Sequence, residues 1–278
     1  MKKISRKNKV VSKSYAHLIL SSVIISVLAC LLSFSLKHLT EHVEELIFNH
    51  VNHFNALVFI LLPSVGITLI YFLRKFLFQK KKNKGITEIY KTLDKRKDHL
   101  PFFKVPSHYI NGFLTVIFGG STGVEVSTVV ATATLGNTAY KYQFSAQKYK
   151  RELICAGVVA GVAVLFSSPL AGLFFAIEVI ARKINGTIII STVVSSLAAW
   201  AFIYLFDNHY FFNTAVEGWH LKALPFFLVL SLCSSVLSVY FTWLVIKIKS
   251  IFGRISNNFL RVNLGAIAVG LLILALPE

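Results

Sequence analysis

One short stretch of the sequence combines glycines, small hydroxyl residues and one acidic residue, a mixture suited to binding anions. It runs from Gly119 to Thr128 and reads Gly-Gly-Ser-Thr-Gly-Val-Glu-Val-Ser-Thr. Because such residues interrupt helices, we expect a gap between an apolar stretch at 110–118 and a new helix at 126–135. A helix that begins inside a membrane presents unpaired N–H groups and the positive end of its dipole, which together attract anions.

Glu125 lies at the expected start of that second helix, and its spacing allows two interpretations. As a gate, the carboxylate occupies the place that a permeating anion would take, and its protonation frees that place. As a cap, it only satisfies donors in the first turn of the helix. The residues alone leave both interpretations open.

A second break divides the long apolar region 153–180 at Ser167-Ser168-Pro169. Proline is favoured as the first residue of a helix, so we predict a new helix at Pro169 with Ser168 as its cap. Glu178 either takes part in proton transfer or pairs with Arg182 four residues later. Small residues on both sides of the break predict close helix packing: Gly157, Ala160, Gly161, Ala163, Ala171 and Gly172.

The composition indicates that lipid is the solvent for much of this chain. Of its 278 residues, 55% are hydrophobic and only 15% are charged, too few to cover a water-soluble domain of this size. The net charge of +17 is concentrated between apolar runs, as in the cytoplasmic loops of membrane proteins. The basic runs lack aromatic stacking platforms, so we expect no nucleic-acid partner. Apolar surroundings predict that Cys30, Cys155 and Cys233 are core residues.

The apolar runs predict an all-α, polytopic helical membrane protein with broken or re-entrant helices. We divide the chain into a basic cytoplasmic arm at 1–15 and a transmembrane domain at 16–278. The positive flank before the first run predicts a cytoplasmic N-terminus in an inner or plasma membrane. An amphipathic segment is expected at 85–100, and a polar external stretch at 207–222. Simple spans are expected at 16–36, 56–78, 184–206 and 223–246, and one more begins at 262–276.

These features resemble the CLC family of chloride channels and chloride/proton exchangers. The string 123–127 falls where that family has its G-[KR]-E-G-P motif, and 83–88 falls where it has G-S-G-I-P-E. Residues 153–178 are similar to the next two helices of the family. The resemblance implies the first half of an inverted repeat, and 276–278 looks like the start of the second half. We therefore expect a chain truncated at its C-terminus, either a shortened reading frame or a natural fragment.

The resemblance also implies site residues, with departures from the family pattern. It makes Glu125 the external gating glutamate. Lys84 replaces the central-site serine and lies either near the ion or in the solvated basic loop. Val179 stands where many exchangers have a proton-transfer glutamate, which favours channel-like conduction over proton coupling. The implied anion-binding residues are Gly123, Val124, Glu125, Val126, Ser127, Lys84, Gly85 and Ile86.

The function expected from the resemblance is transport of a small inorganic anion, with chloride the first expectation. The expected partners are the lipid bilayer, the anion and, for the full-length protein, a second copy in a homodimer. No cofactor, metal or enzymatic activity is expected: His38 and His42 share a face in a predicted external loop but lack a third ligand. The alternative is a truncated, non-transporting protein or subunit that needs a second half.

Overall fold

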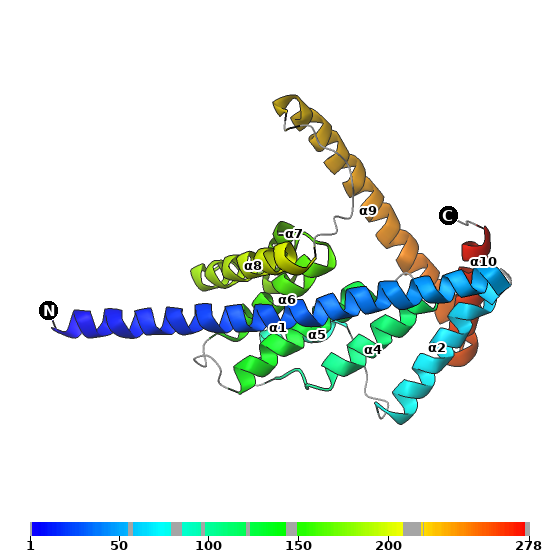
Figure 1. Cartoon of the computed structure of the whole chain (residues 1–278), viewed down its shortest axis with the longest axis horizontal. Helices are drawn as coiled ribbons and strands as arrows, with labels where there is room; N and C mark the ends of the chain where they lie inside the picture. The colour runs from blue at the N-terminus through cyan, green and yellow to red at the C-terminus, as the bar shows by residue number, and fades with distance from the viewer. Residues whose placement is uncertain are drawn as a thin grey trace.

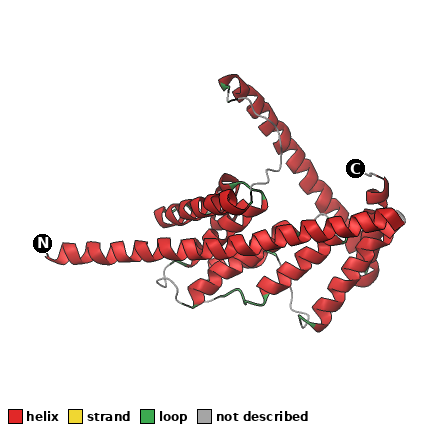
Figure 2. Cartoon of the chain, in the orientation of Figure 1, coloured by secondary structure: helices red, strands yellow, loops and turns green. Residues whose placement is uncertain are grey.

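The chain folds as a set of packed helices, and no strand is present among the residues that the structure describes (Figures 1 and 2). The computed structural model describes residues 2–54, 58–78, 85–95, 98–120, 123–142, 149–207, 218 and 220–275. Its elements, in chain order, are α1 (Lys2–Phe54), α2 (Val58–Phe76), α3 (Ile86–Asp94), α4 (Lys104–Ile117), α5 (Val124–Lys141), α6 (Lys150–Leu165), α7 (Pro169–Phe175), the π-helical turn η1 (Ala176–Ala181), α8 (Gly186–Phe206), the 3-10 turn η2 (Leu221–Ala223), α9 (Leu224–Gly253) and α10 (Asn258–Ala275).

Helix α1 is one continuous helix of 53 residues that passes along the length of the molecule (Figure 1). No glycine or proline occurs before Pro63, so nothing in the sequence ends the helix after its first apolar run. The boundary expected after residue 15 therefore lies inside this helix. The external loop expected around His38 and His42 is wrong, because both residues are helical.

Four helices among the described residues are long and apolar enough to cross a membrane. They correspond to Ser12–Val51, Val58–Phe76, Gly186–Phe206 and Leu221–Gly253. These are the four simple spans expected from the apolar runs, and α10 occupies the expected beginning of a fifth. The chain is therefore a polytopic helical membrane protein.

Helix α6 forms the centre of the core, with α5, α1 and α8 packed around it. Glycines permit these close contacts: a Cβ atom on Gly161 would lie 2.6 Å from Thr132 Cγ2. A side chain at Gly136 would meet the backbone oxygen of Leu153. Gly136 therefore serves packing, and the expectation that the helix ends near it is wrong because α5 continues to Lys141.

The C-terminal helices lie at the edge of the molecule. Helix α9 contains no buried residue and extends away from the core (Figure 1), so the expectation that Cys233 is a core residue is wrong, whereas Cys30 and Cys155 are buried. Helix α10 packs on α2, where Gly270 lies against the backbone of Ile60. An apolar helix exposed along its whole length is consistent with lipid contact.

Candidate anion site

The expected break before Glu125 is present. Helix α4 ends at Ile117, and Gly119 then takes a left-handed backbone with φ of 85°. The N–H of Gly120 turns back to the carbonyl oxygen of Thr115 at 2.8 Å, and α5 begins at Val124. Glycine is favoured at position 119 by this backbone conformation, which side chains rarely adopt.

The first turn of α5 keeps backbone donors at its start. The cap residue is Gly123, which has no side chain to cap the helix. The first helical hydrogen bond runs from the Ser127 N–H to the Gly123 oxygen at 3.0 Å, so the amides of Val124, Glu125 and Val126 precede it. The N–H of Ser127 donates inside the helix, and the side chain of Ser127 packs against Gly112. The donors that remain at this helix start are therefore the amides of Val124, Glu125 and Val126.

The side chain of Glu125 is exposed at this helix start. Within the described part of the chain, no hydrogen bond or ion pair holds its carboxylate. The cap position belongs to Gly123, so Glu125 is not the residue that caps α5. A carboxylate that stands beside backbone donors without being fixed to a partner can move toward them or away from them.

The segment that begins α3, also predicted to bind the anion, lies next to the start of α5. A Cβ atom on Gly85 would lie 3.5 Å from Val126 Cγ1, so the start of α3 lies against the first turn of α5. Gly85 has φ of 59° and provides no side-chain cap. The first hydrogen bond of α3 is from Glu88 N–H to Gly85 oxygen at 3.2 Å, so the Ile86 amide precedes it. Two helix starts therefore converge. Lys84, predicted to bind the anion, lies outside the described residues.

The acidic residue in the first turn of α3 is paired. The Glu88 carboxylate forms an ion pair with the ammonium of Lys104 at the start of α4, and both side chains are largely buried. An unpaired carboxylate this close to Gly85 would repel an anion, and the ammonium of Lys104 compensates its charge. This pair therefore removes a source of repulsion beside the two helix starts.

The break at Ser167-Ser168-Pro169 is also present. Pro169 begins α7, and Ser168 is the cap, whose Oγ accepts from the Ala171 N–H at 3.4 Å. The predicted contact between Glu178 and Arg182 is wrong: among the described ion pairs there is none between them. The Arg182 guanidinium instead stacks 3.6 Å from the centroid of the Tyr90 ring. A π-helical turn and the left-handed backbone of Arg182 end this segment, so i to i+4 spacing does not apply.

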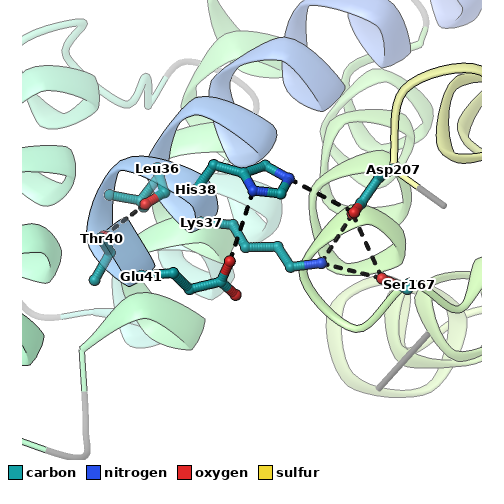
Figure 3. Close-up of polar contacts among 7 residues, drawn as sticks. All are labelled: Leu36, Lys37, His38, Thr40, Glu41, Ser167 and Asp207. Carbon is teal, nitrogen blue, oxygen red and sulfur yellow. Dashed lines mark hydrogen bonds and ion pairs between the residues drawn. The ribbon is translucent and has the colours of Figure 1, made fainter. Parts of the chain in front are cut away.

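Sequence reasoning missed a buried polar cluster beside this second break (Figure 3). The Lys37 ammonium lies 2.8 Å from Asp207 Oδ2 and donates to Ser167 Oγ at 3.1 Å. His38 Nε2 lies 3.6 Å from Asp207 Oδ1. Asp207 was assigned to a polar external stretch, but its side chain is fully buried. The sequence offered one indication of this cluster: Lys37 and Asp207 each directly follow a long apolar run.

The helices and their breaks define the class of this protein: it is a polytopic membrane protein built around interrupted helices. The sequence matches the family described as voltage gated chloride channel over residues 65–278, which is more than half of the chain. The protein therefore belongs to this family, the CLC channels and transporters. A search of curated proteins found no significant match.

Solved structures share the fold. The crystal structure of a CLC-type fluoride/proton antiporter is 24% identical with a TM-score of 0.77, and the match covers 94% of this chain and 65% of that one. The structure of a slow cyanobacterial Cl−/H+ antiporter is 20% identical with a TM-score of 0.69, covering 95% of this chain and 64% of that one. The chain thus spans slightly less than two thirds of each neighbour.

Proposed function

We propose that this protein conducts a small inorganic anion, with chloride as the expected ion, along a pathway gated by Glu125. One observation carries the proposal: the starts of α3 and α5 meet at Gly85 and Val126, beside an exposed carboxylate. Both starts present backbone N–H groups that precede the first helical hydrogen bond. Such donors bind anions without a full positive charge, so an ion is held but can also leave.

The donor set of this proposed site comes from the backbone of two helices. In α5 it comprises the amides that follow Gly123, namely those of Val124, Glu125 and Val126. In α3 it comprises the amides next to Gly85, and Lys84 adds a positive charge in sequence just before them. The anion is the ligand, and the proposal requires no cofactor.

The gating step follows from competition between two negative charges for the same donors. When Glu125 is ionised, its carboxylate is attracted to the start of α5 and opposes an anion there. Protonation removes this charge, and the anion then takes the donors. We therefore expect anion flux to rise as the pH falls.

Channel-like conduction is our first candidate because Val179, a residue that cannot carry a proton, follows Glu178. Its side chain is partly buried and packs against the core cluster. Proton-coupled exchange is the second candidate, favoured by the printed descriptions of both solved neighbours as proton antiporters. The first neighbour also gives a reason to test fluoride beside chloride.

A proteoliposome assay tests the function and separates the candidates. Vesicles containing the full chain are loaded with chloride or fluoride, and efflux is followed together with external pH. Anion efflux without proton movement supports the channel-like proposal, whereas uphill proton movement driven by an anion gradient supports exchange. Efflux no faster than from empty vesicles contradicts transport and favours the non-transporting alternative.

The topology and assembly are part of the proposal. The basic flank of α1 supports a cytoplasmic N-terminus in an inner or plasma membrane, and labelling of single cysteines from each side of the membrane tests it. The family resemblance supports a homodimer for the full-length protein. Light scattering of the detergent-solubilised protein tests this, and a monomer mass would contradict it.

A further inference from the structure

A buried ammonium group contacts the C-terminal end of α3. Lys150 is the first residue of α6, and its side chain is almost completely buried. Its Nζ donates to the backbone oxygen of Thr92 at 2.5 Å, of Lys95 at 2.9 Å and of Asp98 at 2.5 Å. The first of these carbonyls belongs to the last turn of α3, and the other two to the segment that follows it.

The chemistry of this contact matches an ammonium group closely. A lysine side chain has three N–H donors and no acceptor, and the partners of Lys150 among the described residues include the carbonyl oxygens of Thr92, Lys95 and Asp98. The carbonyl end of a helix carries the negative end of its dipole, so a positive charge there is stabilising. A neutral side chain at position 150 would leave the carbonyls without this donor, and an arginine would present a planar fork in place of three diverging N–H groups.

Two further cations contact α3. Arg151 donates to the backbone oxygen of Leu93 at 3.4 Å and to that of Ala181 at 2.7 Å, so it joins α3 to the end of η1. Arg182 stacks on Tyr90 of α3. The C-terminal half of α3 therefore contacts positive residues from α6 and from the end of η1.

The opposite end of α3 is the end at the candidate anion site. The helix has nine residues, which corresponds to a length of about 13 Å. Because a helix this short moves as a rigid unit, a tilt at Thr92 displaces Gly85 and Ile86 from the first turn of α5. The buried Ile89 and the ion pair of Glu88 with Lys104 also hold α3, and the carbonyl contacts of Lys150 hold its C-terminal end.

We propose that Lys150 is a positioning residue for the anion site: it anchors the C-terminal end of α3 and so keeps the Gly85 end against Val126. This inference rests on the proposed function of the two helix starts. Lys150 itself does not touch the anion. Its effect is on how strongly the site holds the ion, and it does not act on the carboxylate of Glu125.

The test is the Lys150→Met variant of the full chain in proteoliposomes, with chloride and fluoride as the probes. Methionine keeps a similar length and removes the charge and all three donors. We expect the half-saturating anion concentration to rise about tenfold, the effect of losing hydrogen bonds to a charged group. The dependence of flux on pH should persist, because Glu125 is unchanged. A half-saturating concentration equal to that of the wild type overturns the inference.

Lys141→Met is the matched control. Lys141 ends α5, is exposed, and follows Tyr140, whose ring centroid lies 5.9 Å from Lys150 Nζ. The Lys141→Met substitution removes an exposed positive charge whose printed contact is with the Tyr142 ring and not with α3, and it should leave the half-saturating concentration at the wild-type value. An equal effect of both variants would attribute the change to surface charge and overturn the inference.

A second measurement does not depend on transport. Hydrogen–deuterium exchange of the amides at 86–94 should accelerate in Lys150→Met, while the amides of α5 and α6 remain protected. Unchanged exchange in Lys150→Met overturns the anchoring role of Lys150. Absence of anion flux in the wild-type protein is a separate outcome, which would refute the proposed function. If Lys150→Met does not fold, the Lys150→Arg variant is measured instead. We expect its half-saturating anion concentration to lie between the wild-type value and ten times that value. Wild-type behaviour in both flux and exchange overturns the proposal.

Discussion

The ammonium of Lys37 and the carboxylate of Asp207 form a buried ion pair at 2.8 Å between residues 170 positions apart in the sequence. The pair joins α1 to the end of α8, and Ser167 in the break before α7 completes it. Helix α1, the end of α8 and the break before α7 are therefore connected by one buried charged cluster.

Removing one charge of this pair should destabilise the protein strongly. Lys37→Met leaves the buried carboxylate of Asp207 without its cation, which costs about 3 kcal/mol. We expect a clear loss of thermal stability in detergent, measured by the fraction of protein that stays monodisperse after heating.

The double variant Lys37→Met with Asp207→Leu is the control for that prediction. Replacing both charges by apolar residues removes the unpaired group, so most of the lost stability should return. A double variant as unstable as the single one would show that the loss came from packing and not from the unpaired charge.

Local chemistry was sufficient to predict the breaks in the helices. Glycine and hydroxyl residues before Glu125, and Pro169 after a serine, act through the backbone of their own neighbours, so each break could be placed without knowledge of the fold. The pairing of Lys37 with Asp207 could not be predicted in this way. Each charge follows a long apolar run and has the pattern of a solvated flank, and only packing of α1 beside α8 buries both.

Ser168 should stabilise the start of α7 as a cap. Its hydroxyl accepts from Ala171 N–H, so Ser168→Ala should cost about 1 kcal/mol, whereas Ser168→Gly should cost only a few tenths. Thermal unfolding in detergent measures both. Equal stability of the alanine variant and the wild type would mean that the cap contributes nothing.

Gly136 should tolerate no side chain. An added Cβ would meet the backbone oxygen of Leu153, which cannot move without shifting α6, so we expect Gly136→Ala to cost about 3 kcal/mol. Gly253→Ala is the comparison, because nothing lies within 4 Å of its Cβ position. It should stay within about 0.5 kcal/mol of wild type. Similar unfolding midpoints for the two variants would contradict the tight contact between α5 and α6.

The candidate site shows where sequence reasoning reaches its limit. The family resemblance pointed to Gly85 and Val126 separately, but their adjacency depends on the packing of α3 against α5. The resemblance also included Ser127, and only the structure shows that its N–H donates to the Gly123 oxygen inside the helix. Lys150 carried no signal at all, because it belongs to a basic run whose other members are typical of a solvated surface.

The most direct test of the gate is the pH dependence of anion flux in Glu125→Gln. Glutamine has the shape of the protonated carboxyl group and carries no charge, so it should act as a permanently open gate. In proteoliposomes containing the full chain, we expect the variant to conduct faster than wild type at neutral pH and to show a flat pH profile, while wild-type flux rises as pH falls. A variant with the same pH profile as wild type would contradict the role of Glu125 as the gate.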